Sequence, residues 1–275
     1  MNDVHIHCFQ DRAVNFREDY FSDDFFRLLY QSNKASIAGS DYVKDYLINS
    51  KTEKAVILSF PWMKDEFLIE QNEYFASVRD QFAEGIHFFG NISFNSRDIE
   101  RDIESLINLG FSGIGEIAFY DGNVRYDYLD EILYFAGQEN LPVNIHLNET
   151  VGHNYPGKYF TDFQKLSDIL ARNADTNVIL SHLGGGFLFY FLMPEIRNSL
   201  TNVYFDISAS PFLYLDDVYR TALLCAPGKI LFGTDFPLIG KDRYMKTISG
   251  DCARDIDLST NYFFDHVLTG RMKES

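Results

Sequence analysis

The sequence predicts an α/β fold, a (β/α)8 (TIM) barrel formed by a single domain over residues 1–275. Eight short apolar segments have the length and composition of strands that are buried on both faces, as in a parallel sheet. The longer segments between them repeat apolar residues every three or four positions, which is typical of helices covering such a sheet. The chain length of 275 residues fits one barrel, which typically has about 250 residues.

The expected strands follow one another along the chain at intervals that leave room for helices. They cover residues 3–9, 54–60, 86–93, 111–119, 141–147, 177–183, 202–208 and 229–234. Strands that alternate with helices in this way indicate parallel pairing. The count of eight favours a closed barrel over an open sheet, and no GxGxxG motif follows the first strand to favour a dinucleotide-binding fold.

The expected helices show an apolar stripe and recognisable ends. They cover residues 22–31, 40–49, 97–110, 126–140 and 160–175. Gly110 stands where a C-capping glycine belongs, directly before the fourth strand. The segment 10–53 is long for one crossover, which is why two helices are expected in it.

Composition restricts the classes of function. Hydrophobic residues make up 46% of the chain, enough for a large core, and the net charge of −16 disfavours binding to nucleic acid. Three widely spaced cysteines fit a reducing cytosol, and no 18-residue apolar run or secretory signal is present. We therefore expect a cytoplasmic protein that acts on a small molecule and has no nucleic-acid or membrane partner, with a homodimer as an option for its assembly.

Ionisable residues concentrate at the carboxyl ends of the expected strands, which form one rim of a barrel. His5 and His7 in "DVHIH" are two positions apart, so they share a face of the first strand, together with Asp3. The other strands contribute Glu116 in "GIGEIAFY", His146 in "VNIHLNE", His182 in "ILSHLGGG", Asp206 in "YFDIS" and Asp235 in "GTDFP".

Each of these residues alone has an ordinary explanation, such as a helix cap or a hydrogen bond to a backbone carbonyl. Together they would be costly to bury unless a divalent cation compensates their charge. Mixed imidazole and carboxylate ligands suit zinc, and also iron or manganese. On the fourth strand, alternation places Ile114 with Glu116 on one face and Gly115 with Ile117 on the other. We expect Glu116 to contact metal, with a hydrogen bond to a neighbouring strand as the alternative.

The order of these motifs resembles the amidohydrolase superfamily of metal-dependent barrels. The residues on either side of these histidines and carboxylates look most like the amidohydrolase-2 branch of the superfamily, which contains aminocarboxymuconate-semialdehyde decarboxylase. The resemblance spans residues 3–237. It implies the following metal ligands: His5, His7, His146 and Asp235. It also implies that His182 orients or deprotonates the attacking water or binds a second metal. Glu116 stands where many binuclear members have a carboxylated lysine, and it resembles the bridging glutamate of the TatD-like deoxyribonucleases.

The resemblance and the residue types together predict a metal-dependent hydrolase that acts on an amide, ester, lactone or phosphoester of a small molecule. The expected cofactor is a divalent metal, Zn²⁺ in one or two copies, which activates a water molecule. Asp235 is expected to accept the proton of that water, and His182 to hydrogen-bond the developing oxyanion. The alternatives are a non-oxidative decarboxylase that uses the same ligands and a non-catalytic barrel that retains the metal for stability.

Substrate contacts are expected from the loops at the same rim. The sequence offers Trp62 after the second strand, Arg125 after the fourth and His153 after the fifth. Other basic and aromatic candidates at this rim are Arg97, Tyr155, Lys158, Lys241 and Arg243. An arginine could pair with a carboxylate or phosphate, whereas the ordinary alternative for each basic residue is a solvated surface charge.

Overall fold

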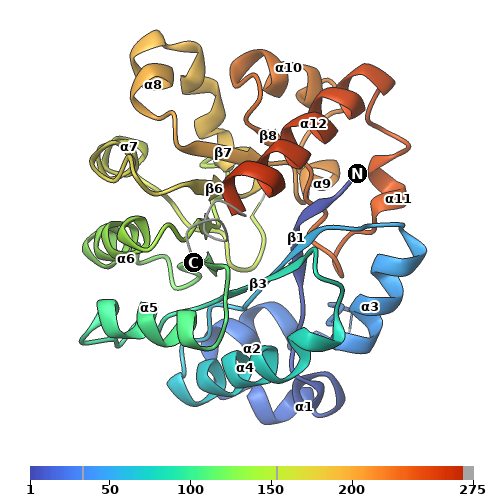
Figure 1. Cartoon of the computed structure of the whole chain (residues 1–275), viewed down its shortest axis with the longest axis vertical. Coiled ribbons are helices and arrows are strands. Elements are labelled where there is room, and N and C mark those ends of the chain that lie inside the picture. The colour runs from blue at the N-terminus through green and yellow to red at the C-terminus, as the bar shows by residue number, and fades with distance from the viewer. Residues whose placement is uncertain (33, 153, 269–275) are drawn as a thin grey trace.

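The computed structural model describes residues 1–32, 34–152 and 154–268 and confirms the predicted barrel (Figure 1). Eight strands in these residues form one parallel sheet in the order β1 to β8. Hydrogen bonds from Val4 N to Phe232 O and from Asp235 N to His5 O, both 2.9 Å long, join the last strand to the first. The sheet therefore closes on itself, and the fold is a single-domain (β/α)8 barrel.

Each strand lies inside the segment that the sequence predicted, although all are shorter. The strands are β1 (Asp3–His7), β2 (Ala55–Leu58), β3 (Ile86–Gly90), β4 (Gly113–Ile117), β5 (Val143–Ile145), β6 (Val178–Leu180), β7 (Val203–Asp206) and β8 (Ile230–Leu231). The shortening falls mainly at the carboxyl ends, where the chain leaves the sheet and places polar side chains over the rim.

The helices surround the strands (Figure 1). They are α1 (Asp11–Asn15), η1 (Arg17–Tyr20), α2 (Asp24–Tyr30), α3 (Ser40–Asn49), α4 (Asp65–Val78), η2 (Arg79–Gln81), α5 (Ile99–Asn108), α6 (Tyr126–Gln138), α7 (Phe163–Arg172), η3 (His182–Leu192), α8 (Pro194–Ser199), α9 (Ser210–Leu213), α10 (Val218–Cys225), α11 (Lys241–Tyr244), α12 (Gly250–Tyr262) and η4 (Phe263–Leu268). The five expected helices are present, and the segment 10–53 contains α1 and η1 in addition to the two expected helices. Among the described residues, no helix combines the length and apolar character needed to cross a membrane.

The apolar side chains of the strands divide into two layers. Those that point outward pack against the surrounding helices and form the larger core. Those that point inward, among them Val4, Val56 and Phe89, form a separate core with Phe263 and Phe264 of η4. The barrel interior below the polar rim is thus filled by side chains, as is usual for this fold.

Two irregularities in strand register correct the expected side-chain alternation. Between Asp3 and Ile6, β1 advances three residues while β2 advances two, and between Ile114 and Ile117 β4 does the same against β5. Ile114 and Ile117 consequently both pack outward, so Ile114 does not share a face with Glu116 as alternation predicted. An extra residue in one strand is a β-bulge, which redirects the neighbouring side chains.

The same irregularity on β1 separates Asp3 from the histidines. Its carboxylate accepts hydrogen bonds from Thr234 Oγ1 at 2.8 Å and from the backbone N–H groups of Thr234 and His5, both at 3.1 Å. Asp3 therefore fastens β1 to the segment that follows β8 instead of joining His5 and His7 at the rim.

A cluster of aromatic side chains fills the space above β1 and β2. It combines Phe9 and Phe60, which follow these strands, with Phe26 of α2, and it extends to Phe67 of α4. Trp62 lies at its centre, 1% exposed and stacked on Phe26 at 4.9 Å between ring centroids. Its indole N–H donates to the Gln71 side chain. The expectation that Trp62 contacts substrate is therefore wrong, because side chains from residues 9–30 pack over it and bury it.

The burial of Trp62 leads to a stability prediction. Replacing Trp62 by Ala leaves a cavity in the aromatic cluster and is expected to lower the free energy of unfolding by about 3–5 kcal/mol. Urea denaturation measures this change. The control is Leu215→Ala, at a side chain that is 84% exposed, for which a change within about 0.5 kcal/mol is expected. Equal effects of the two substitutions would contradict the buried position of Trp62.

Candidate metal centre

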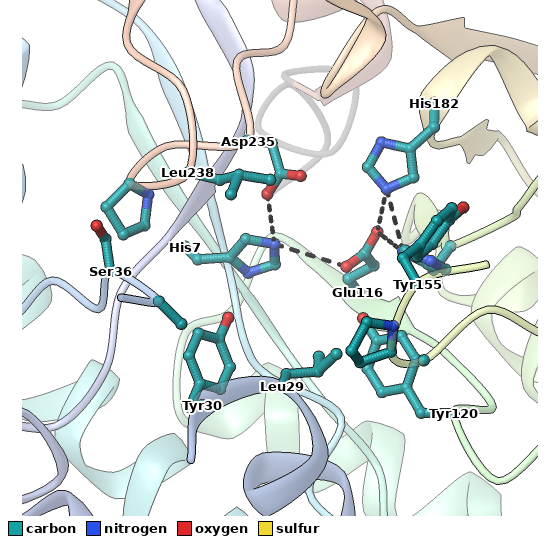
Figure 2. A pocket seen from close by; sticks show the side chains of 15 residues that line it. His7, Leu29, Tyr30, Ser36, Glu116, Tyr120, Tyr155, His182, Asp235 and Leu238 are labelled. Atoms are coloured by element: carbon teal, nitrogen blue, oxygen red, sulfur yellow. Dashed lines mark hydrogen bonds and ion pairs between the residues drawn. The ribbon is translucent and has the colours of Figure 1, made fainter. Parts of the chain in front are cut away.

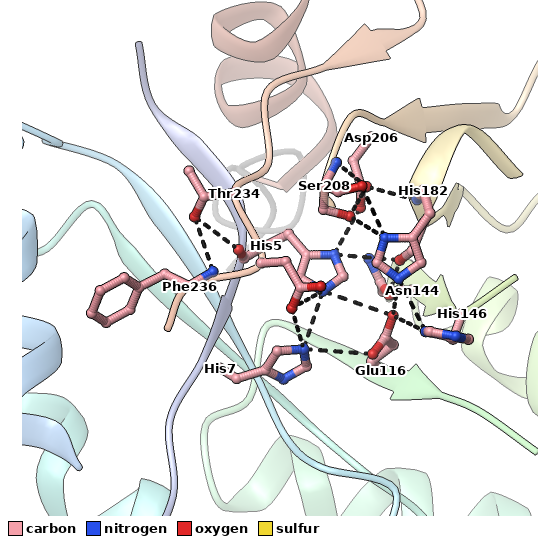
Figure 3. Close-up of polar contacts among 12 residues, drawn as sticks. His5, His7, Glu116, Asn144, His146, His182, Asp206, Ser208, Thr234 and Phe236 are labelled. Atoms are coloured by element: carbon pink, nitrogen blue, oxygen red, sulfur yellow. Dashed lines mark hydrogen bonds and ion pairs between the residues drawn. The ribbon is translucent and has the colours of Figure 1, made fainter. Parts of the chain in front are cut away.

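The ionisable residues that the sequence places at strand ends meet at one rim of the barrel (Figure 3). His5 and His7 belong to β1 and Glu116 to β4, whereas three others follow β5, β6 and β8: His146, His182 and Asp235. All are at least partly buried, and Glu116 is only 2% exposed. The barrel thus concentrates imidazole and carboxylate groups in a small volume with little access to water.

One group of potential ligands joins the first strand to the segment after the last. The Nε2 atoms of His5 and His7 lie 3.1 Å apart. Asp235 Oδ1 lies 3.7 Å from Nε2 of His5 and 3.4 Å from Nε2 of His7. The three side chains present one ligand atom each within 4.8 Å of one another, a spacing at which they could hold a metal ion.

A second group of potential ligands lies beside the first and contains Glu116, His146 and His182. His146 Nδ1 is 3.1 Å from Glu116 Oε1 and also 3.1 Å from His182 Nε2. Glu116 faces the first group as well, with Oε1 3.8 Å from His5 Nε2 and Oε2 3.6 Å from His7 Nε2 (Figure 3). Glu116 thus stands between the two groups and reaches both of them.

This arrangement regroups the expected ligands. The sequence predicted one metal held by His5, His7, His146 and Asp235, whereas the structure places His146 with Glu116 and His182. The expected rim and the inward direction of Glu116 agree with the structure. The partition into two groups depends on where each strand ends relative to its neighbours, which is a property of the sheet register.

Hydrogen bonds on the far side of the imidazole rings fix which nitrogen faces the cluster. His5 Nδ1 donates to Asp206 Oδ2 at 2.9 Å, and His182 Nδ1 donates to the Ser208 carbonyl at 3.0 Å. His146 Nε2 lies 3.2 Å from Asn148 Oδ1, which is also an acceptor. In a neutral ring, the opposite nitrogen then has a free lone pair, as metal binding requires. When these three rings are neutral, each presents an unprotonated nitrogen to the cluster, so the donor set fits a bound metal ion.

The carboxylates of the cluster hold its charge negative. Burial raises the pKa of Glu116, but His146 and His5 lower it well below its usual value. Burial raises the pKa of Asp235 too, while a hydrogen bond from His7 and the charge of His5 lower it to about 2. Burial lowers the pKa of His5, but Asp206 and Glu116 together raise it to about 10. The site therefore attracts positive charge strongly, either as protons on imidazole or as a metal cation.

His182 behaves differently because it has a cationic neighbour. Burial and the proximity of His146 lower its pKa, so the ring stays neutral. Its backbone φ is +58°, and that of Asp235 is +66°, a left-handed conformation that is uncommon outside glycine and costs of order 1 kcal/mol. Both residues turn the chain sharply at the end of a strand and so place their side chains over the barrel opening.

A cavity of about 210 Å³ opens above the cluster. Its wall includes five of the six cluster residues: His7, Glu116, His146, His182 and Asp235. Figure 2 shows Tyr30, Tyr120, Leu29 and Leu238 around the opening. A small molecule that enters this cavity therefore meets the potential metal ligands directly.

Of the residues expected to contact substrate, Tyr155 lines this cavity, whereas Trp62 and Arg125 do not. Trp62 is buried in the aromatic cluster, as described above. Arg125 pairs with Asp121 at 2.7 Å and covers the ring of Phe94 at 4.8 Å, and neither it nor Trp62 is among the described residues of the wall. His153 lies outside the described residues. Charge at a loop position did not predict contact with the cavity, because a local acidic partner can hold the side chain elsewhere.

Comparison with known proteins identifies the family of this chain. A sequence profile with the description "Amidohydrolase" matches residues 59–259, which is most of the barrel. The chain belongs to the amidohydrolase family. It is an enzyme of the amidohydrolase type, and no curated protein matches its sequence with significant similarity.

Solved structures show the same fold at low sequence identity. A 5-carboxyvanillate decarboxylase from Novosphingobium aromaticivorans, with bound manganese and 3-methoxy-4-hydroxy-5-nitrobenzoic acid, has 12% identity and a TM-score of 0.69, with 96% of each chain covered. An Acinetobacter baumannii protein assigned as a 2-pyrone-4,6-dicarboxylic acid hydrolase, with citric acid bound, has 13% identity and a TM-score of 0.63. That alignment covers 98% of this chain and 100% of the other.

Sequence reasoning missed several residues of this amidohydrolase's site. Asp206 was noticed at the end of β7, but its position behind His5 required the structure. Its other oxygen, Oδ1, accepts from the backbone N–H groups of His182 and Ser208, both at 3.0 Å. No sequence pattern marked Tyr30 or Tyr120 as residues of the cavity wall. The one local hint is that Tyr30 falls in the unusually long segment between β1 and β2. Asp206 therefore orients both groups of potential ligands from beneath.

The position of Asp206 leads to a prediction about metal binding. Asn in its place keeps the acceptor Oδ1 but turns an N–H toward His5 Nδ1, which moves the imidazole proton to Nε2 and blocks the ligand. Asp206→Asn is therefore expected to weaken Zn²⁺ binding by about 10–100-fold, measured by competition with a chromogenic chelator. The exposed Asp216→Asn serves as the control. Unchanged affinity in a folded Asp206→Asn protein would remove Asp206 from the metal centre.

Proposed function

We propose that this amidohydrolase is a metal-dependent hydrolase that cleaves an amide, ester, lactone or phosphoester bond of a small molecule. The observation behind this proposal is the pair of ligand groups, bridged by Glu116, at the floor of a cavity. An ion held for stability alone needs no opening, whereas these groups face a space that is large enough for a substrate.

We further propose two divalent ions, with Zn²⁺ as the expected metal. His5, His7 and Asp235 would hold one ion, His146 and His182 the other, and Glu116 would contact both. Imidazole and carboxylate donors suit zinc, and the manganese in a structural relative supports that metal as an alternative. When bound, such ions supply a water of lowered pKa and polarise a substrate carbonyl or phosphoryl oxygen.

Asp235 is the best placed proton carrier. Only its Oδ1 makes ion pairs with histidines, and Oδ2 has no hydrogen bond or ion pair with the described residues. Asp235 is ionised and lines the cavity, so Oδ2 can accept a proton from the attacking water and return it to the leaving group.

The sequence suggested His182 either as a group that acts on the water or the oxyanion or as a ligand of a second metal, and its hydrogen bonds favour the second of these roles. Because Nδ1–H donates to the Ser208 carbonyl, the neutral ring presents Nε2 as an acceptor and cannot donate a hydrogen bond to an oxyanion. We therefore propose His182 as a ligand and not as an oxyanion donor. Non-oxidative decarboxylation on the same donor set is the second candidate, favoured by the decarboxylase among the structural relatives.

The first prediction of this proposal concerns metal stoichiometry. Wild-type apoprotein is expected to bind two Zn²⁺ ions per chain, whereas Glu116→Gln should lose the second ion or bind it at least about tenfold more weakly, because the amide has no charge to bridge two cations. Isothermal titration calorimetry with metal analysis measures both quantities. Glu131→Gln, on the exposed surface of α6, is the control. The same stoichiometry and affinity in Glu116→Gln would make Glu116 a structural residue and the site mononuclear.

The second prediction concerns the reaction itself. A panel of small esters, lactones, amides and aromatic carboxylic acids is monitored for proton release and for loss of CO₂. Hydrolysis is expected, chelation should abolish it, and Asp235→Asn should lower kcat by about 100-fold or more in protein that still contains metal. Metal-dependent release of CO₂ without hydrolysis would replace the hydrolase by the decarboxylase. Full turnover of the chelated protein would refute both.

A further inference from the structure

Outside the cluster, the described wall of the cavity contains no lysine or arginine side chain. Its described residues there are apolar or carry hydroxyl groups. The apolar residues of the wall include Leu29, Pro156, Pro237 and Leu238. A substrate group that lies against this wall, away from the cluster, therefore meets no positive charge.

The basic residues that the sequence placed at this rim are engaged elsewhere. Two lysines donate to backbone carbonyls: Lys158 to that of Val151 at 2.7 Å, and Lys241 to those of Met1 and Ser50 at 2.7 and 2.9 Å. Arg125 pairs with Asp121, and Arg243 covers the Phe212 ring. Arg97 lines a different groove, beside α4 and α5. Arg17 approaches α2 but donates to the carbonyls of Tyr30 and Ser32. Each of these contacts holds a charged group against backbone, a carboxylate, a ring or another groove.

The polar groups of the described wall outside the cluster are hydroxyls, from Ser36, Tyr155 and two further tyrosines. Tyr30 and Tyr120 line the cavity, and their hydroxyls form no hydrogen bond with the described residues. Figure 2 shows the Tyr30 hydroxyl turned toward the side of the cavity that His7 occupies. Both hydroxyls are protonated at neutral pH, because a phenol ordinarily has a pKa of about 10. They are thus two neutral donors beside the cluster.

From this wall we infer that the site selects a small ring substrate that has no charge beyond the group reacting at the cluster, and that Tyr30 and Tyr120 donate hydrogen bonds to its oxygen atoms. The inference rests on the proposed function and names its substrate class. A second carboxylate would enter the cavity without a counter-charge, and desolvating an unpaired carboxylate is costly. A neutral lactone loses little on entry and satisfies both hydroxyls.

The test compares two ligands with the same ring and different charge. The probes are 2-pyrone and 2-pyrone-4,6-dicarboxylate, titrated into the zinc-loaded protein and followed by ligand-observed NMR. We expect 2-pyrone to bind at least about tenfold more tightly. Equal or tighter binding of the dicarboxylate, or no binding of 2-pyrone, overturns the inference. Binding needs no turnover, so a protein that prefers 2-pyrone but hydrolyses nothing would contradict the proposed function alone.

Variants assign the selectivity to particular residues. Tyr30→Phe and Tyr120→Phe keep the rings and remove one donor each, so each should weaken 2-pyrone binding by about 3–10-fold. Tyr134→Phe, at an exposed position of α6, should have no effect. Leu238→Arg adds a guanidinium to the wall and should strengthen dicarboxylate binding by about tenfold or more. Unchanged 2-pyrone binding in both phenylalanine variants overturns the role of the tyrosines.

Discussion

A carboxylate surrounded by imidazoles is the constraint on which the rest of this structure depends. Glu116 is 2% exposed and ionised, and four histidines approach its oxygens at 3.1–3.8 Å. Such a group is stable only while positive charge stays next to it, whether as protons or as metal ions. The barrel meets this need by ending its strands at one rim, and Asp206 fixes the tautomer of His5 from beneath.

The apolar part of the barrel makes this polar cluster possible. Inward-facing side chains, closed off by Phe263 and Phe264, exclude water from below, so each charge interacts in a medium of low polarity. The same close packing leaves no freedom for the ligands to move apart. Two β-bulges adapt the regular alternation of the strands so that His5 and Glu116 reach the rim while Ile114 and Ile117 stay in the outer core.

The segment between β1 and β2 links stability to selectivity. Its aromatic residues pack on Trp62 and Phe60, and the same helix α2 that contributes Phe26 ends at Tyr30 in the cavity wall. The wall is therefore continuous with the apolar aromatic cluster that contains Trp62. A cavity built in this way offers hydroxyl donors and hydrophobic surface, and its described wall outside the cluster contains no lysine or arginine.

The sequence by itself determined the barrel, the rim and the residue types of the cluster, because strand length, apolar periodicity and strand-end positions are local properties of the chain. The tertiary structure decided which ligands form a group. His146 joins Glu116 and His182 because the register across the sheet, including the bulges, sets how far each side chain reaches. It also decided where Trp62 and Arg125 lie, since the burial of Trp62 by residues 9–30 and the pairing of Arg125 with Asp121 depend on how loops fold over one another. Likewise, Tyr30 reaches the cavity only through the packing of α2, which no local pattern shows.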